Sequence, residues 1–596
     1  MRRAALTAVQ AGLLLLPVVL AFFSGAFFEG ARLIAAICAW ALLALAALAV
    51  PGLPLPGAKH ARAALVALAG LAAWTWIAAS WSSSPAGADQ ELELALLYLP
   101  ALAAGAIAWS DRRAARMVEP ALAAGALIVI GYGLSGRLLP GVVHLHATAR
   151  AGGRLEQPMT YWNATGALAA IGLVLCARLA GDVTRPRVLR IAAAAAAAPL
   201  GMGAYLSFSR GAIACLLAGL AALVAFDRSR AQLRAALIAL GAGALAGAAA
   251  APFGAVRALH PGHATAEGLA VLALLAVIAA GAALLQARAG ERRSPLRLRA
   301  APVVAVVVAL ALLPYAAVIL AERGAPSRDA AFGATNARLS DVGTHRLSYW
   351  RVGVDVAADH PIAGAGPGAF AVEWLRRRTI DERVRNAHSL ELQTLADLGL
   401  VGLALLPYAA VVLAEGGGPS RDAAFGATNA RLSDVGTHRL SYWRVAVDVA
   451  ADHPVAGAGP GAFAVEWLRR RTIDERVRNT HSLELQTLAD LGLVGLALLG
   501  GVLAARSVLG ADRALAAGPA AGALTWALHA GLDWDWEMPA VTLVAVALAG
   551  LLLCRAGAAD GVDQLGNEAA LQAQARQDDD GAEEHELGDR LGLRPA

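Results

Sequence analysis

Lysine and cysteine are nearly absent from this chain. Lys59 is the single lysine among 596 residues, so almost all positive charge comes from arginine, and no basic stripe interleaved with aromatics is present. This pattern argues against a nucleic-acid partner. The four cysteines lie inside apolar runs without metal-ligand spacing, at Cys38, Cys176, Cys215 and Cys554. They predict neither a disulfide framework nor a zinc site.

Long apolar runs dominate what is present. Hydrophobic residues make up 58% of the chain, and its mean hydropathy is +0.57. A helix needs about 20 apolar residues to cross the hydrocarbon core of a membrane. We therefore predict an all-α, polytopic helical membrane protein with about 14 transmembrane helices and one segment of ambiguous topology. The apolar segments fall at roughly 9–28, 33–50, 62–80, 92–109, 119–134, 164–180, 190–206, 211–226, 235–253, 267–286, 302–320, 395–414, 488–506, 515–531 and 538–554.

Arginine placement orients these segments. Clusters such as Arg2-Arg3, Arg112-Arg113 and 185–190 recur after every second apolar segment. Because cytoplasmic loops carry the excess of positive charge, we expect the N-terminus in the cytoplasm. The extracytoplasmic loops are then 82–91, 136–160, 207–211, 255–266 and 321–392. The run after Arg3 is long and is followed at once by further apolar segments, so it predicts an uncleaved first helix.

A 93-residue segment occurs twice in tandem. Residues 310–402 (copy one) and 403–495 (copy two) differ at only six positions. These are Ile319/Val412, Arg323/Gly416, Ala325/Gly418, Gly353/Ala446, Ile362/Val455 and Ala387/Thr480. Each copy contains an odd number of apolar segments. The duplication therefore inverts the membrane orientation of all later segments, unless one apolar segment fails to cross the membrane.

The segment that joins the copies decides this topology. Residues 393–414 are apolar over a sufficient length to cross, whereas an unchanged orientation of the last two helices requires that they do not. Both arrangements remain open. The predicted organisation is 1–320 transmembrane helices, 321–392 loop copy one, 393–414 hybrid segment, 415–486 loop copy two, 487–555 C-terminal transmembrane helices and 556–596 a disordered acidic tail.

The two loop copies hold the densest set of reactive side chains. Each contains THRLSYWR, then a glycine-rich DHP stretch, an arginine cluster and Asn-x-His-Ser-Leu-Glu before the next apolar run. The glycines at 364, 366 and 368 lack the Lys-Ser/Thr pair of a Walker loop and predict a tight turn between helices. His388 and His481 lie at the mouth of an apolar helix. There a neutral imidazole is either a general base or an interfacial side chain.

Polar side chains also interrupt the apolar pattern outside the repeat. Arg210 in SFSRGA lies between two apolar segments on the predicted outer side, where it would either bind a phosphate or join two helices. The other candidates to line a substrate site are Arg154, Tyr161 and Asn163 in RLEQPMTYWNATG, and Asp533, Asp535 and Glu537 in HAGLDWDWEMP. The three alternating carboxylates lack a neighbouring ligand set, so we predict no metal.

Three motifs together resemble the O-antigen ligase/polymerase family. They are SRG between two mid-chain helices, R-x-x-x-W followed by HP-x-x-G-x-G, and H-S-x-x-L-x-x-x-x-x-x-G-x-x-G entering the next helix. The resemblance covers about residues 60–550. It implies a GT-C-like fold in the cytoplasmic membrane with its active site on the extracytoplasmic side. The implied activity is metal-independent, inverting glycosyl transfer from an undecaprenyl-pyrophosphate-linked donor to a glycan or lipid acceptor hydroxyl, within membrane lipid and without a cofactor.

The resemblance also assigns roles to residues. It implies that His388 and His481 are the catalytic histidines of the two copies, and that Arg210 with Arg346 or Arg439 binds the pyrophosphate. We favour copy two slightly, because it joins directly to the helices that follow. Ligase and polymerase share these motifs and stay unresolved here. The alternatives are a membrane solute transporter and a ligase inactivated by its internal duplication.

Overall fold

The computed structural model describes residues 2–50, 59–81, 85–259, 264–290, 346–414 (without 379 and 381), 513–530 and 532–554. Of copy two it describes 445–450, 452, 453, 458, 462–471 and 489. The predicted segment 302–320, the segment 488–506 apart from residue 489, and the acidic tail lie outside the described residues. Every element of the described chain is helical, which confirms the predicted fold class.

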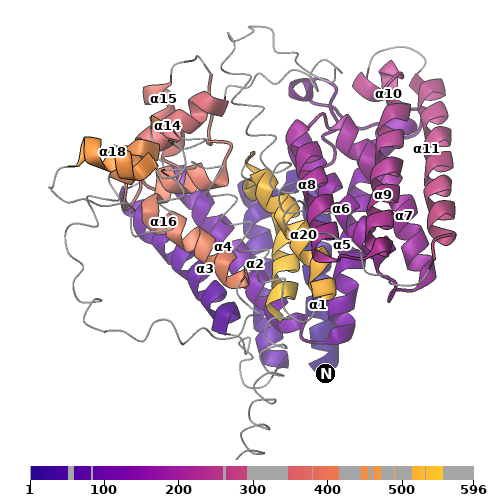
Figure 1. Cartoon of the computed structure of the whole chain (residues 1–596), viewed down its shortest axis with the longest axis horizontal. Helices are drawn as coiled ribbons and strands as arrows, with labels where there is room; N and C mark the ends of the chain where they lie inside the picture. The colour runs from indigo at the N-terminus through magenta and orange to yellow at the C-terminus, as the bar shows by residue number, and fades with distance from the viewer. Residues whose placement is uncertain are drawn as a thin grey trace, which may run out of the picture.

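The helices carry the labels of Figure 1. The first part of the chain contains α1 (Arg2–Ala21), α2 (Glu29–Ala49), α3 (Lys59–Ala78), α4 (Pro85–Ala108), α5 (Arg112–Leu138), α6 (Trp162–Gly181), α7 (Arg187–Leu206), α8 (Arg210–Phe226), α9 (Arg230–Ala250), α10 (Gly254–Ala258) and α11 (Ala264–Ala287). The second part contains α14 (Arg346–Asp359), α15 (Phe370–Arg377), α16 (Leu390–Ala414), α18 (Ala462–Arg470), α20 (Arg513–Ala530) and an unlabelled helix Pro539–Cys554. Short 3-10 helices lie at Ser24–Ala26, Ala79–Trp81, Ala149–Ala151 and Asp535–Glu537.

Nine helices of the described chain are long and apolar enough to cross a membrane, namely α1 to α7, α9 and α11. Two shorter apolar helices, α8 and Pro539–Cys554, accompany them. The molecule is thus a multi-pass membrane protein, although the predicted count of about 14 is not reached within this part of the chain. Helices α4 and α5 begin earlier than their apolar runs, because their first two turns include polar residues, such as Glu91 in α4 and Arg112 in α5.

Helix α6 forms the centre of the bundle. Every residue from Ala164 to Gly181 is buried, as expected for a helix that is apolar on all sides. Small residues let its neighbours approach closely. At the crossing of α7 and α9, a side-chain carbon on Gly201 would lie 2.1 Å from the Cα of Gly243. Close packing of small residues therefore replaces large apolar side chains in much of this core.

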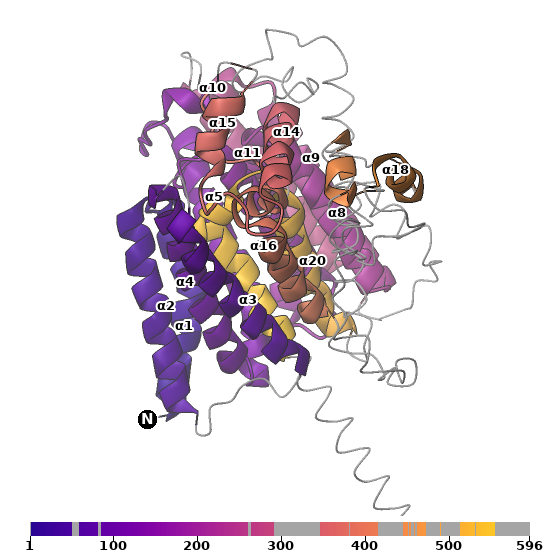
Figure 2. The ribbon, with the colours of Figure 1, turned by 90° about the vertical axis from the view of Figure 1, so that its left-hand side faces the viewer.

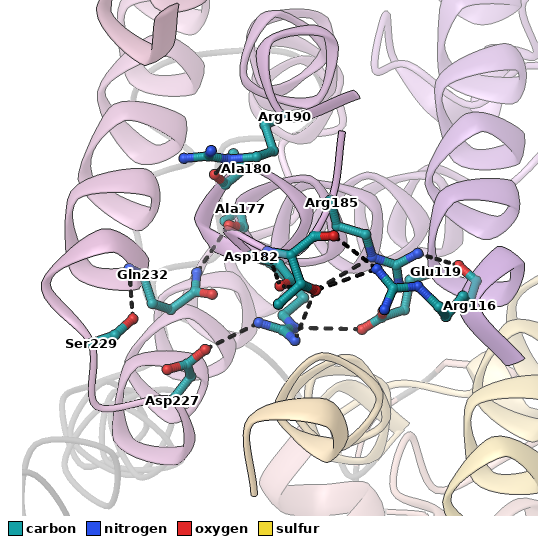
Figure 3. A network of polar contacts seen from close by, with 12 residues as sticks. Arg116, Glu119, Ala177, Ala180, Asp182, Arg185, Arg190, Asp227, Ser229 and Gln232 are labelled. Atoms are coloured by element: carbon teal, nitrogen blue, oxygen red, sulfur yellow. Dashed lines mark hydrogen bonds and ion pairs between the residues drawn. The ribbon is translucent and has the colours of Figure 1, made fainter. Parts of the chain in front are cut away.

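A polar network closes the end of the bundle at which α1 begins (Figure 3). The guanidinium of Arg178 contacts Asp227 at 3.1 Å and Asp182 at 3.3 Å, and Arg185 contacts Glu119 at 2.7 Å. All five side chains are buried. The network joins α5, α6 and the segments before α7 and α9. This end carries the arginine clusters Arg112-Arg113 and 185–190, which the sequence predicts to be cytoplasmic.

Replacing Arg178 with glutamine should strongly destabilise the bundle. The change leaves Asp182 and Asp227 buried without their shared cation. Removal of one partner of a buried ion pair lowers the free energy of unfolding by about 3–5 kcal/mol. The measurement is thermal and denaturant unfolding of the purified protein in detergent. Arg187→Gln is the matched control, because Arg187 is exposed and donates only to the carbonyl of Ala287. Equal stability of the two variants would contradict a structural role for the network.

Helix α16 contains the predicted hybrid segment. It lies beside α3 and α20 (Figures 1 and 2) and is kinked at Gly399, where φ is +64°. The indole nitrogen of Trp74 in α3 donates to the carbonyl of Leu398 at 3.0 Å, which satisfies a backbone oxygen at the kink. The hybrid segment is therefore a helix packed against the bundle, not part of the polar loop.

The described part of copy two folds as copy one does. In α18, Arg470 contacts Glu466 at 2.9 Å and Asp452 at 2.6 Å, which repeats the contacts of Arg377 in α15 with Glu373 and Asp359. Buried residues of both copies, Trp374 and Trp467 among them, belong to one apolar cluster. Figures 1 and 2 show α18 toward the same end of the bundle as α14 and α15, so these parts of the two copies lie at one end.

Candidate functional site

A cavity of about 400 Å³ opens at the end of the bundle opposite the Arg178 network. Its walls come from the residues before α6, the start of α8, α14, the segment before α16 and the turn after α20. These elements are far apart in the sequence, and both copy one and the unrepeated helices contribute. Polar, charged and aromatic side chains dominate its lining. They include Tyr161, Asn163, Ser209, Arg210, Arg346, Tyr349, Glu382, His388, His529, Asp533 and Trp534.

Asp533 is the hub of this cavity. One carboxylate oxygen contacts His388 Nδ1 at 3.0 Å and accepts the Tyr161 hydroxyl at 2.6 Å. The other oxygen accepts Arg346 at 3.1 Å and the Asn163 amide. The structure therefore brings four predicted residues into contact with the carboxylate of a fifth, Asp533.

The surroundings keep Asp533 ionised. Burial acts to raise its pKa, but the hydrogen bond and charge of His388, together with the charge of Arg346, outweigh burial and hold the pKa well below its usual value. Burial and the charge of Asp533 raise the pKa of Tyr161 well above its usual value. Tyr161 therefore remains a phenol that donates to Asp533.

His388 is fixed from two sides. Its backbone lies in the left-handed region with φ of +52°, a strained conformation for a residue other than glycine. Its ring stacks on Tyr349 at 5.5 Å between centroids, and the Tyr349 hydroxyl donates to Glu382 at 2.7 Å. Because the ionised Asp533 contacts Nδ1, the favoured tautomer carries its hydrogen there and leaves Nε2 to accept a proton.

Arg210 lies where α8 begins. It is the first residue of the helix, directly after Ser209, whose side chain accepts from the backbone of Ala212. Both residues line the cavity. A helix N-terminus and a guanidinium at one wall suit a phosphate group, which agrees with the phosphate-binding alternative for Arg210.

The three alternating carboxylates turn to different partners. Asp533 lines the cavity, whereas Asp535 contacts His529, and Glu537 accepts Gln90 at 2.8 Å and Asn386 at 3.2 Å. Burial raises the pKa of Glu537 to about 7. Asp535 and Glu537, predicted as possible substrate-lining residues, are therefore not part of the lining of this cavity. They support the cavity from behind, because each is tied to a neighbouring segment.

Arg154 also differs from its prediction. Its guanidinium lies 3.5 Å from the ring centroid of Trp162 and donates to the carbonyls of Ala151 and Arg150. It does not line the cavity. The stacking contact and the backbone acceptors hold this arginine inside the loop, where it shapes the segment that carries Tyr161 and Asn163.

The glycine-rich stretch of copy one forms a turn, as predicted. Its amides are used by Asp397 of α16, whose carboxylate accepts from Gly368 at 2.9 Å and Phe370 at 2.8 Å. A phosphate loop would instead direct its amides at a ligand. The turn therefore fastens α15 to α16 and positions the segment that carries His388.

Replacing Gly364 with alanine should loosen this turn. Gly364 has φ of +69°, and a side-chain carbon there would lie 2.3 Å from the backbone of Asp397. Strain of this kind costs roughly 1–3 kcal/mol, measurable as a lower unfolding midpoint. Gly353→Ala is the matched control, because copy two carries Ala446 at that position and the added carbon meets nothing closer than 3.7 Å. A control as unstable as Gly364→Ala would contradict the interpretation.

Several cavity residues were not predicted as site residues. Tyr349, Glu382 and Ser209 line the cavity, and His529 joins them from α20. Two of them had a signal in the sequence. Tyr349 lies one helical turn after Arg346, and Ser209 directly precedes Arg210.

Of the two predicted site sets, the described residues contain that of copy one. His388 and Arg346 of copy one line the cavity. Their equivalents in copy two, His481 and Arg439, lie outside the described residues.

A comparison with known protein families agrees with this geometry. The family described as O-antigen ligase matches residues 263–406 and, separately, residues 410–500. Over these two segments the chain is similar to the O-antigen ligase family. The two matched segments correspond to the two copies, and the first contains the helices and loop that carry Arg346 and His388.

The similarity to the O-antigen ligase family points to a glycosyltransferase-type activity in polysaccharide assembly, with lipid-linked glycan substrates in the membrane. No curated protein matches the chain in a search of such sequences. Among the described residues, no group of three or more His, Cys, Asp or Glu side chains is arranged to hold a metal ion.

Proposed function

We propose that the chain transfers or polymerises a glycan from an undecaprenyl-pyrophosphate-linked donor onto an acceptor hydroxyl at the extracytoplasmic face of the cytoplasmic membrane. The observation that carries this proposal is the cavity that holds His388, Arg210, Arg346 and Asp533 together. It supplies one proton acceptor and two cations, as displacement of a diphosphate by a hydroxyl requires.

The residues act in a single displacement. Arg210 and Arg346 face the diphosphate and stabilise the charge that develops on it as the glycosidic bond to phosphate breaks. Nε2 of His388 takes the proton of the acceptor hydroxyl while its oxygen attacks the anomeric carbon. Asp533 stabilises the imidazolium that forms. Undecaprenyl pyrophosphate leaves with the bonding electrons.

The working site is that of copy one. Arg346 lies next to Asp533, and His388 contacts the same carboxylate, so copy one and the helices after the repeat already form a complete set. A complete set predicts an active enzyme and argues against the inactivated ligase. We place the cavity on the extracytoplasmic side, because its lining residues lie at the end of the bundle opposite the arginine-rich end.

Reconstitution in liposomes tests the activity. With carrier-linked glycan and an acceptor present, we expect a lengthened acceptor and released undecaprenyl pyrophosphate. Flux of a solute without any carrier-linked donor would support a transporter instead. A host lacking the gene separates the two activities, because single repeat units at its surface indicate a polymerase, and long unattached carrier-linked chains indicate a ligase.

A further inference from the structure

A second histidine–carboxylate pair lies in the cavity wall. His529, in the last turn of α20, contacts Asp535 through Nδ1 and the hydroxyl of Ser209 through Nε2, the latter at 3.4 Å. Exposed fractions are 1% for His529, 0% for Asp535 and 4% for Ser209. Asp533 and Asp535 thus each hold a different histidine, with Trp534 between them. His388 serves as the proposed base, and the second pair has no role in that reaction so far.

The second pair acts on the start of α8. Ser209 is the residue that caps this helix, and its hydroxyl oxygen accepts from the backbone of Ala212 at 3.3 Å. The ring of His529 also covers Gly211, where an added side-chain carbon would lie 3.4 Å from Nε2. Arg210 lies between these two contacts. Any movement of His529 would therefore move the helix terminus that presents Arg210 to the cavity.

The hydroxyl of Ser209 has one hydrogen and two contacts to satisfy. If His529 carries hydrogen only on Nδ1, the hydroxyl donates to Nε2 and has nothing left for a ligand. If both ring nitrogens carry hydrogen, Nε2 donates to the hydroxyl oxygen, and the hydroxyl hydrogen is released toward the cavity. The buried Asp535 stabilises that second, charged ring.

We propose that Asp535, His529 and Ser209 are positioning residues that turn the Ser209 hydroxyl toward the donor diphosphate and hold Arg210 beside it. This inference rests on the proposed function. The diphosphate then receives the Ser209 hydroxyl and the Arg210 guanidinium from the N-terminus of α8, where the helix dipole also favours an anion. Binding of the diphosphate favours the charged form of His529, so the chain of three residues recognises the donor rather than the acceptor.

The test separates donor recognition from structure. We compare Ser209→Ala and His529→Gln with the wild type for the KM of carrier-linked donor, the KM of acceptor, kcat, and inhibition by free undecaprenyl pyrophosphate. A hydrogen bond to a charged group corresponds to about a 10- to 100-fold change in affinity. We expect the donor KM and the inhibition constant to rise by that factor in Ser209→Ala, with the acceptor KM unchanged.

Charge coupling gives a second readout. Besides Asp535, the charged groups facing His529 are Asp533 in the same turn, Arg210 on α8 and Arg346 on α14. If the ring must be charged, inhibition by undecaprenyl pyrophosphate should weaken more steeply with rising pH in the wild type than in His529→Gln. An equal pH dependence of inhibition in the two proteins would overturn the link between the charge of His529 and binding of the diphosphate.

Thr525→Val is the matched control for losing a buried hydroxyl. Thr525 lies one turn before His529, is buried, and donates only to the carbonyl of Ala521. We expect it to change stability without changing the donor KM. An unchanged donor KM in Ser209→Ala, or equal rises for donor and acceptor, would overturn the proposal. Failure of the proposed function is distinguishable, because the wild type itself would then transfer no glycan.

Discussion

Cells that carry His388→Ala are expected to accumulate carrier-linked glycan and to lose surface glycan. Without the base, transfer should fall roughly 10²- to 10⁴-fold, because nothing else in the proposed mechanism accepts the proton of the acceptor hydroxyl. The measurement is the ratio of carrier-linked to surface glycan in the native host, with protein levels matched by immunoblot.

His481→Ala is the matched control within the same chain. It makes the same chemical change at the equivalent position of the repeat, and we expect a glycan ratio close to that of the wild type. If His481→Ala accumulates carrier-linked glycan and His388→Ala does not, copy two is the working copy. If the double variant matches the wild type in a host whose gene deletion has a phenotype, the general-base mechanism fails.

Asp533→Asn should be nearly as damaging. The amide cannot accept from Tyr161, Arg346 and the Nδ1 hydrogen of His388 together, so the imidazole loses its orientation and its preferred tautomer. The same change beside another catalytic histidine lowers kcat about 10⁴-fold. Purified variant and wild type are compared in single-turnover transfer. Asp227→Asn is the control, because this buried carboxylate pairs with Arg178 at the other end of the bundle and should lower stability while the folded fraction keeps its kcat.

The pH dependence of stability offers a check on the same residue. The pKa of Asp533 is lower in the folded chain than its unfolded value of about 3.9. Its contribution to stability is therefore fully present above that value and is lost as pH falls through the lower, folded pKa. Asp533→Asn should remove this part of the acid sensitivity. A wild type and variant with parallel stability curves between neutral and strongly acidic pH would contradict the ionised hub.

The sequence predicted the helices better than their ends. Apolar runs located the described helices of the bundle, because burial and a lipid environment both require apolar side chains. They missed the first two turns of α4, which contain Glu91, and the first turn of α5, which contains Arg112. The boundaries of such helices depend on which polar groups find partners at the membrane surface, and hydropathy does not contain that information.

The site was predicted in its members but not in its connections. The motifs selected His388, Arg346 and Arg210, and all three line one cavity. That Asp533 would join His388 to Tyr161 depends on contacts across 145 and 372 positions of the chain, which no local pattern reveals. Arg154 was misplaced for the same reason, because its contact with Trp162 makes it part of the loop rather than of the cavity surface.

The slight preference for copy two came only from its position before the last helices, because the motifs of the two copies do not distinguish them. None of the six differences changes a histidine of the motif or the arginine of R-x-x-x-W. The nearest is Ala387, which is fully buried beside His388 and is replaced by Thr480 in copy two. Only the packing of copy one against α8 and α20 favours His388 as the base.

The stereochemistry of the product tests the central claim, a single displacement at the His388 cavity, most directly. A retaining reaction would need a carboxylate nucleophile, and Asp533 is held by five donors, namely Tyr161, Asn163, Arg346, His388 and the backbone of Trp534. The measurement is NMR of the new glycosidic bond formed by purified protein from a donor of known anomeric configuration. The account predicts inversion at the anomeric carbon, and retention would contradict it.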